Sequence, residues 1–221
     1  MTPVEHFNKF GYVIIKQVLP ETICNLYYSY SISKLKKSKY KMEETPESYN
    51  TAYDGWQGEK LEGVKSFNFY GDEFTEVMLE AIKPYVEKST DLELHSTYGF
   101  LRVYSTDDVL PMHVDRKSCA VSCSLNIGHN IENLEDKDYK WPFKVKIDND
   151  IRDLILNTGD IVIYKGCELI HGRPDGYKGN NHAQAFLHYN TNDKYDRLFD
   201  NRKHLGLPHP SALRKVKDSR K

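Results

Sequence analysis

Two histidines and one aspartate in the second half of the chain have the types and spacing of a metal site. His113 and Asp115 are separated by one residue in the segment LPMHVDR, and His171 comes later in LIHGR. Residues two apart on a strand point to the same side, so His113 and Asp115 can bind one ion together. Two imidazoles and one carboxylate leave coordination positions open, which suits an Fe(II) ion that must bind O2 and an organic molecule. We predict that these three residues are the catalytic metal ligands.

The His-x-Asp pair also has an ordinary explanation. The chain has 9 histidines, so such a pair arises readily by chance, and a hydrogen-bonded surface pair is the alternative. The neighbouring sequence favours a metal site. The pair lies in a segment of strand character, and His171 follows a second such segment, GDIVIYKG. The histidines elsewhere in the chain lack partners at ligand spacing, His182 on the last predicted strand apart.

Short strands must position these residues. From residue 98 onward, β-branched and aromatic runs alternate with turn residues and no helical pattern interrupts them. We predict strands at 98–106, 110–116, 118–127, 143–148, 152–157, 160–165, 168–172 and 182–190. This pattern is typical of a mainly β protein with a jelly-roll, double-stranded β-helix core of the cupin-like kind.

One predicted strand shows its two faces clearly. In 118–127, small polar residues such as Ser122, Ser124 and Asn126 alternate with apolar ones such as Cys123 and Leu125. Alternate side chains of a strand lie on opposite faces. A small polar face leaves room inside a barrel, so we expect a ligand cavity there.

The first half of the chain predicts a supporting layer. A buried strand at 11–19 precedes helices at 21–39 and 72–88, with a long polar loop at 42–66 between them. Tyr53 and Trp56 in that loop are either a lid over a substrate or part of a surface excursion. We expect one structural unit, in which residues 1–97 support a core at 98–190 and residues 191–221 form a C-terminal extension.

Composition narrows the classes of function. The formal net charge is -1, so nucleic acid is not an expected partner, and the basic runs at 34–41 and 214–221 read as solvated faces. None of the 4 cysteines forms a CxxC pair, as in reduced cytoplasmic proteins. No apolar run approaches the roughly twenty residues of a membrane span, and we see no signal peptide.

From GYVIIKQVLP to Tyr189, the chain resembles the 2-oxoglutarate/Fe(II)-dependent dioxygenases, in a prolyl-4-hydroxylase-like branch. The ligands of that family fall on His113, Asp115 and His171. The resemblance implies a hydroxylase that uses Fe(II), 2-oxoglutarate and O2, with ascorbate as a further reductant. The substrate would be a peptidyl residue or a small molecule, and succinate and CO2 would be released. Asp115 favours hydroxylation, because related halogenases replace this carboxylate with a small residue.

One departure from the family affects co-substrate binding. The family usually holds the distal carboxylate of 2-oxoglutarate with an Arg or Lys about ten residues beyond the distal histidine, where this chain reads GNNHAQAF. We predict that Arg173 is the anchor instead, supported by His182 and Gln184, which share a strand face. The alternative for Arg173 is a surface ion pair. The family also suggests Tyr104 and Asn126 as co-substrate contacts, with plain barrel packing as the alternative for Tyr104.

Two other functions are compatible with the sequence. A non-catalytic, cupin-like module could bind a metal and a ligand without turnover, although structural zinc sites usually have four protein ligands. A nucleic-acid demethylase of the AlkB-like kind would need a basic groove and base-flipping aromatics, which the overall charge disfavours.

Overall fold

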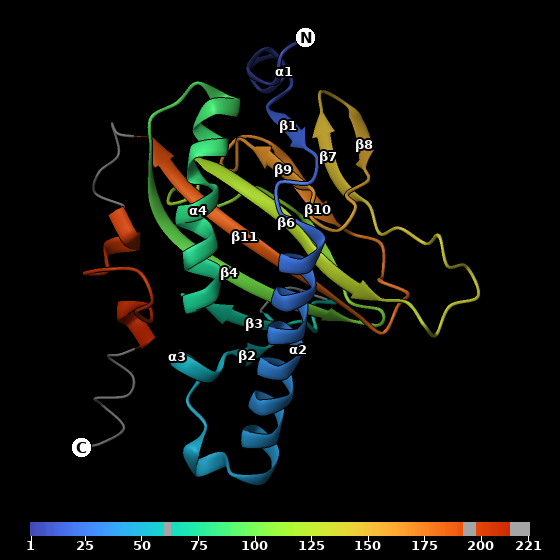
Figure 1. The fold of residues 1–221 in the computed structure, drawn as a ribbon, viewed down its shortest axis with the longest axis vertical. Helices are drawn as coiled ribbons and strands as arrows, with labels where there is room; N and C mark the ends of the chain where they lie inside the picture. Colours follow the sequence, from blue (N-terminus) through green and yellow to red (C-terminus); the bar gives the residue numbers. More distant parts are fainter. Residues whose placement is uncertain (60–62, 192–197, 213–221) are drawn as a thin grey trace.

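The computed structural model describes residues 1–59, 63–191 and 198–212 (Figure 1). The first half contains α1 (Pro3–Phe10), β1 (Tyr12–Ile15), α2 (Glu21–Glu44), the 3-10 turn η1 (Pro46–Ser48), α3 (Thr51–Asp54), β2 (Trp56–Gln57), β3 (Phe67–Tyr70) and α4 (Glu73–Thr90). The second half contains β4 (Leu94–Ser105), β5 (Leu110–His113), β6 (Val121–Asn130), β7 (Phe143–Ile147), β8 (Asp150–Leu154), β9 (Ile161–Tyr164), β10 (Ile170–Arg173) and β11 (Asn181–Thr191). The basic run at 214–221 lies outside the described residues.

The strands form two antiparallel sheets. Seven strands follow the order β1-β9-β6-β11-β4-β3-β2, and four follow the order β5-β10-β7-β8. Apolar side chains of both sheets pack together between them, among them Phe143, Val145, Val162 and Tyr164. This arrangement is the double-stranded β-helix that the strand pattern predicts.

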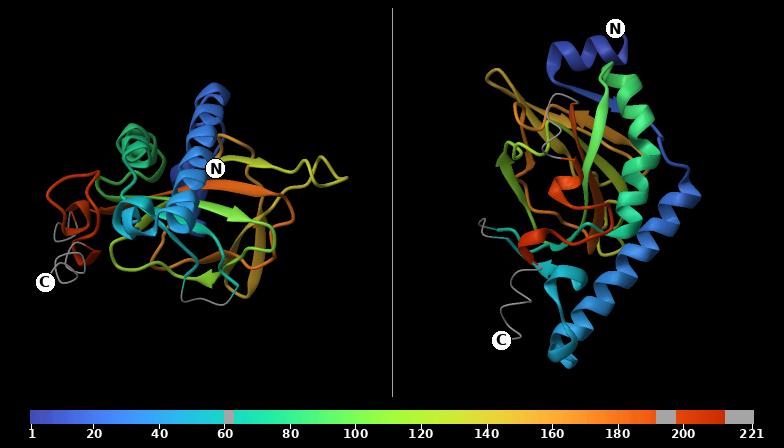
Figure 2. Two further views of the ribbon diagram at one scale, coloured as in Figure 1. Left: turned by 90° about the horizontal axis from the view of Figure 1, so that it is seen from below. Right: turned by 90° about the vertical axis from the view of Figure 1, so that its left-hand side faces the viewer.

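Helices α2 and α4 cover the outer face of the larger sheet (Figures 1 and 2). The predicted stripe of α4, Leu79, Ile82 and Val86, is fully buried against that sheet. Tyr27 of α2 donates a hydrogen bond from its hydroxyl group to Thr75 Oγ1 of α4 at 2.7 Å, which joins the two helices. The helical layer therefore closes one face of the larger sheet and leaves the inner face to the site.

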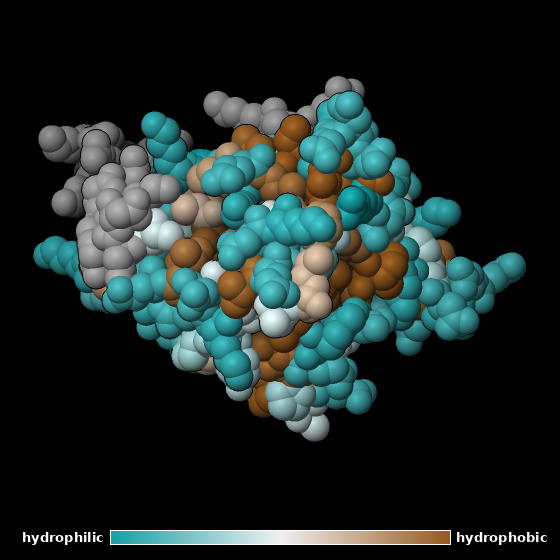
Figure 3. Space-filling view, turned by 90° about the horizontal axis from the view of Figure 1, so that it is seen from above, coloured by the Kyte–Doolittle hydropathy of each residue, from teal (hydrophilic) through white to brown (hydrophobic). Residues whose placement is uncertain are grey.

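The inner face is the small polar one that the sequence predicts. Ser122, Ser124 and Asn126 of β6 are buried, but Cys123 and Leu125 are the residues that pack in the core beneath the helices. The outer surface is mixed: seen from the side of α1, apolar residues lie in small groups among polar ones (Figure 3). Among the described helices, none is both long and apolar enough to cross a membrane.

Several element boundaries differ from the sequence-based prediction. Helix α1 was not predicted, although Thr2 and Glu5 form a capping box around Pro3, which is a recognisable helix start. Within the predicted loop at 42–66, α3 and β2 form, and β2 pairs with the short, unpredicted β3. Propensity rules miss such short elements because tertiary pairing stabilises them.

The predicted strand at 110–116 is wrong in its second half. β5 ends at His113, so Asp115 lies in the turn that follows rather than on the strand. The reason is a hydrogen bond from the Asp115 backbone N–H to the Gly166 carbonyl oxygen at 2.8 Å, which takes the chain away from β10. The predicted strand at 118–127 is also shifted, since β6 runs from Val121 to Asn130.

Candidate metal centre and co-substrate pocket

The structure brings the three predicted ligands together at one end of the space between the sheets. His113 on β5 and His171 on β10 are directly paired in the antiparallel register. Asp115 Oδ1 lies 3.5 Å from His113 Nε2 and 3.6 Å from His171 Nε2. The three ligand atoms lie within 4.8 Å of one another, so one ion can contact all three.

Both histidines are held in the tautomer that a metal requires. The Nδ1 atom of His113 lies 2.8 Å from the Pro111 carbonyl oxygen, and that of His171 lies 2.8 Å from the Leu169 carbonyl oxygen. A carbonyl oxygen can only accept a hydrogen bond, so each Nδ1 carries the proton. The lone pair of each ring therefore lies on Nε2, the atom that faces Asp115.

Asp115 is oriented from the side opposite the histidines. Its Oδ2 accepts a hydrogen bond from Ser122 Oγ at 2.6 Å, and Ser122 Oγ lies 2.9 Å from His188 Nδ1. Since a carboxylate only accepts, the chain of donors runs from His188 through Ser122 to Asp115. Gly166 permits this approach, because a Cβ there would lie 2.7 Å from Asp115 Oδ2.

The protonation states also suit a cation. Burial alone would raise the pKa of Asp115, but the adjacent imidazole rings of His113 and His171 hold it well below its usual value. Burial lowers the pKa of His188 to about 4, so this ring is neutral near pH 7. Two imidazole nitrogens and one carboxylate, with no thiolate among them, match the set that binds Fe(II) at sites with open positions. The residues present therefore fit an iron ion.

A pocket of about 270 Å³ opens at the three ligands. His171 is buried, while the side chains of His113 and Asp115 keep 31% and 13% of their exposure, so the ligand set faces this pocket. The rest of its lining includes Tyr98, Phe100, Arg102, Tyr164, Phe186 and His188. A metal here would have its three protein ligands on one side and room for further ligands on the other.

Arg173 lies buried deeper between the sheets and is only 1% exposed. Its guanidinium donates hydrogen bonds to the Trp141 carbonyl oxygen and, at 3.1 Å, to Gln184 Oε1, while its Nε atom has no partner. Burial lowers its pKa to about 10. Among the described residues, no carboxylate forms an ion pair with Arg173. The alternative of a surface ion pair is therefore wrong. The Arg173 side chain is a buried positive charge whose Nε–H can still donate a hydrogen bond.

The other predicted co-substrate residues are distributed around Arg173. Gln184 Oε1 lies 2.8 Å from His182 Nε2, and Tyr104 is fully buried with an unpartnered hydroxyl group. Asn126 donates from Nδ2 to the Leu156 carbonyl oxygen, and its Oδ1 is unpartnered in the described structure. Buried polar atoms without partners are uncommon in folded proteins and point to an absent ligand or water.

Sequence reasoning missed three residues of this site, Arg102, Ser122 and His188. Arg102 lines the metal pocket from β4, pairs with Glu59, and has unpartnered Nε and Nη1 atoms in the described structure. The sequence could have indicated Arg102, because it lies two residues from the predicted site residue Tyr104 and therefore on the same strand face. Ser122 and His188 reach the site only through the pairing of β6 with β11, in which they are register partners.

Solved structures share this fold. A prolyl-4-hydroxylase from Pseudomonas putida has a TM-score of 0.58 at 12% identity, covering 84% of this chain and 96% of its own. The non-heme alpha ketoglutarate dependent carbocyclase SnoK from nogalamycin biosynthesis has a TM-score of 0.63 at 12% identity, covering 93% and 94%. HygX from Streptomyces hygroscopicus, with nickel and 2-oxoglutarate bound, has a TM-score of 0.55 at 10% identity, covering 86% of both chains.

No protein-family model matches this sequence, and no curated protein is similar to it in sequence. At 10–12% identity, the structural likeness shows the fold: the double-stranded β-helix of the 2-oxoglutarate-dependent oxygenases. The chemistry must be argued from the residues of this chain.

Proposed function

We propose that this protein is an Fe(II)- and 2-oxoglutarate-dependent dioxygenase that hydroxylates a peptidyl residue or a small molecule. The observation that carries the proposal is the ligand set. Two Nε2 atoms converge with one carboxylate oxygen beside a pocket, and in each ring the opposite nitrogen, Nδ1, donates to a backbone carbonyl, which leaves Nε2 as the atom that can bind a metal. Likeness in fold to oxygenases that use 2-oxoglutarate supports it.

In this proposal, His113, Asp115 and His171 hold the iron. An iron ion held there would, with 2-oxoglutarate and O2, supply the oxidising power for hydroxylation of a C–H bond, and succinate and CO2 would be released. Ser122 keeps one oxygen of Asp115 occupied, so that the other remains directed at the metal. Burial of His171 and of the surrounding aromatic rings excludes water from one side of the reacting centre.

Arg173 is the proposed anchor for the distal carboxylate of 2-oxoglutarate. A buried guanidinium without a carboxylate partner offers the charge-assisted hydrogen bonds that this group requires. Gln184 fixes the Arg173 guanidinium and is itself bonded to His182 and Ser124. Tyr104 contributes its free hydroxyl group. Asn126 is proposed as a further polar contact from the inner face of β6. Ascorbate would serve as a further reductant.

The proposal also includes the expected domain organisation and cellular location. We propose that residues 1–97 support the core at 98–190 as one unit with the C-terminal extension 191–221, of which the structure describes residue 191 and residues 198–212. We also propose a cytoplasmic location, because Cys24, Cys119 and Cys123 are buried as free thiols, as in proteins of a reducing compartment.

Anaerobic titration of the Fe(II)-loaded protein with 2-oxoglutarate tests the proposal. We expect a saturable visible charge-transfer band that is lost in His171→Ala. If iron is bound and no band develops, the protein is instead a metal-binding module without 2-oxoglutarate chemistry, which is the second candidate function.

A further inference from the structure

A larger cleft of about 1100 Å³ adjoins the pocket at the metal ligands. The two hollows share three lining residues, Tyr98, Phe100 and Arg116. A molecule in the cleft can therefore extend a group to the metal pocket without crossing solvent. Small-molecule sites commonly measure about 300 to 1000 Å³, so the cleft exceeds what a free amino acid would fill.

Two distant parts of the chain form the walls of this cleft. One wall is the stretch 47–52 together with Trp56, which belongs to the predicted lid; Tyr53 of that lid lines a different hollow. The other wall is the C-terminal stretch 209–212. A buried ion pair between Arg202 and Glu76 of α4, at 2.6 Å, holds this C-terminal part of the chain against the body of the protein.

Five aromatic rings, those of Tyr49, Trp56, Tyr70, Tyr98 and Phe100, lie among the residues that line the cleft. Tyr70 and Tyr98 are stacked, with ring centroids 4.9 Å apart, and Trp56 meets Phe100 edge-on at 5.7 Å. Tyr49 adds a further ring to the lining. Flat aromatic faces bind other rings by stacking and by apolar contact.

The hydroxyl groups of these tyrosines are already engaged within the protein. Tyr49 donates to the Gly55 carbonyl oxygen at 2.6 Å, and Tyr70 donates to Asp200 at 2.7 Å. The Tyr98 hydroxyl lies 3.3 Å from Cys119 Sγ. What Tyr49 and Tyr70 offer a ligand is therefore ring surface rather than hydrogen bonds, which does not suit the regular polar edge of a peptide backbone. The Tyr98 ring is 8% exposed, because it lies between Tyr70 and Arg116.

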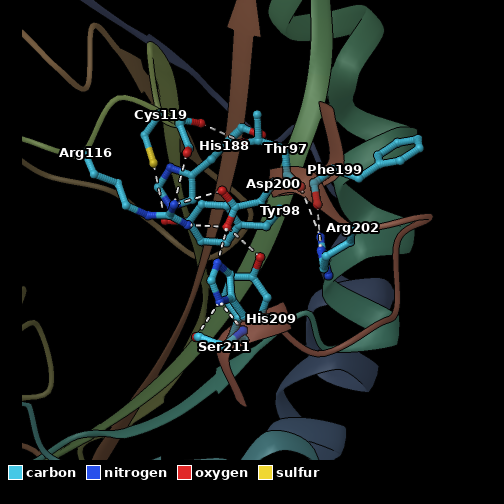
Figure 4. Close-up of polar contacts among 12 residues, drawn as sticks. Thr97, Tyr98, Arg116, Cys119, His188, Phe199, Asp200, Arg202, His209 and Ser211 are labelled. Carbon is cyan, nitrogen blue, oxygen red and sulfur yellow. Dashed lines mark hydrogen bonds and ion pairs between the residues drawn. The ribbon is translucent and has the colours of Figure 1, made fainter. Parts of the chain in front are cut away.

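The charged groups of the cleft are also largely engaged with one another. Arg116 donates two hydrogen bonds to the buried Asp200 carboxylate, at 2.8 Å and 2.6 Å. Figure 4 shows Arg116 and His209 both contacting that carboxylate, with His209 Nε2 at 3.8 Å. The positive charge of Arg116 is thereby matched inside the protein, and Glu47, the other charged lining residue, is exposed to solvent. The cleft therefore does not select a strongly charged ligand.

We propose that this cleft binds the body of the substrate, and that the substrate is an uncharged, ring-bearing small molecule larger than a free amino acid. Its rings would lie against Tyr49, Trp56 and Tyr70, and one edge would extend past Phe100 towards the metal ligands. This inference rests on the proposed function for the reaction that follows binding, but the binding itself depends only on the cleft.

Binding to the full-length protein tests the inference, by calorimetry with and without Fe(II) and 2-oxoglutarate. The probes are phenyl glucoside, flavone and anthraquinone, with free L-proline, free L-tryptophan and a capped proline-containing pentapeptide as competing classes. We expect saturable binding of at least one ring compound. Trp56→Ala and Tyr70→Leu should each weaken it about threefold to tenfold, the effect of losing one aromatic partner. Tyr85→Ala, which removes an exposed ring on α4, is the matched control and should leave it unchanged.

Tighter binding of the pentapeptide or a free amino acid would overturn the inference, as would absence of binding by all ring compounds or insensitivity to Trp56→Ala. The 2-oxoglutarate titration separates this result from the proposed function. Ring binding without a charge-transfer band removes the dioxygenase assignment and keeps the cleft. A charge-transfer band without ring binding keeps the dioxygenase assignment and removes the proposed substrate class.

Discussion

Replacing Arg173 with methionine should separate co-substrate binding from folding. The Arg173 guanidinium is 1% exposed and lies 4.8 Å from the centre of the Trp141 ring, without a carboxylate partner among the described residues. Methionine has similar length and no charge, so it fills the same space. We expect Arg173→Met to fold normally and to lose its affinity for 2-oxoglutarate.

The expected effect on stability is small because two contributions oppose each other. Burial lowers the pKa of Arg173 from 12.5 to about 10, which corresponds to about 3 kcal/mol against the charged form in the interior. Removing the charge relieves this cost, but it also removes hydrogen bonds to Trp141 and Gln184, each of which contributes about 1 kcal/mol. The free energy of unfolding should therefore stay within about 1 kcal/mol of the wild-type value.

The expected effect on binding is large. Truncating one partner of a buried charged pair costs about 3 to 5 kcal/mol, so the dissociation constant for 2-oxoglutarate should rise at least about 100-fold. The assay is the anaerobic charge-transfer titration of the Fe(II)-loaded protein, with urea denaturation of the same samples for stability. Arg152→Met is the matched control, because Arg152 is an exposed cation on β8.

A dissociation constant within about threefold of wild type would refute this role for Arg173. Arg102→Met is then the informative comparison, since Arg102 lines the metal pocket with two unpartnered nitrogens in the described structure. Loss of binding in that variant alone would move the anchor to Arg102.

Three further predictions concern stability, pH and metal binding. Gly55→Ala should lower the free energy of unfolding by at least about 2 kcal/mol, because Gly55 has φ +80° and a Cβ there would lie 2.4 Å from a backbone oxygen. Burial alone would raise the pKa of Asp200, but hydrogen bonds from Arg116 lower it to about 2. About 2 kcal/mol of stability is therefore present above pH 4 and lost as the pH falls from about 4 to 2, and Asp200→Asn should abolish that loss. His171→Ala should weaken Fe(II) binding by at least about 100-fold, since it removes one of three ligands.

Each of these has its own check. Gly11→Ala is the control for Gly55, because Gly11 has φ +77° but its nearest contact is 3.8 Å away, so only about 1 kcal/mol should be lost. Equal losses in the two glycine variants would contradict the steric argument. For Asp200, parallel pH profiles of wild type and variant in urea denaturation would contradict the calculated contribution. Iron affinity in His171→Ala is measured by competition with a chelator, and an unchanged value would exclude this residue as a ligand.

The local sequence was enough to predict the type of fold and the three residues that converge in the candidate metal site. Strand-forming runs separated by turns predicted the double-stranded β-helix, and the alternation at Ser122, Ser124 and Asn126 predicted the polar inner face. His113, Asp115 and His171 could be selected because their types are those of an iron site. Because the last strand has no Arg or Lys at the position the family uses, the sequence suggested Arg173 as the anchor for the co-substrate carboxylate. The structure shows Arg173 buried between the sheets.

Only the tertiary structure decided how those residues are held. Asp115 lies beyond the end of β5, and its orientation depends on Gly166 and Ser122, which come from other parts of the chain. The cleft likewise needs the C-terminal Asp200 to reach Arg116. Side-chain periodicity is a local property that a sequence displays directly, whereas these contacts depend on strand register and on turns between distant segments, which packing of the whole chain determines.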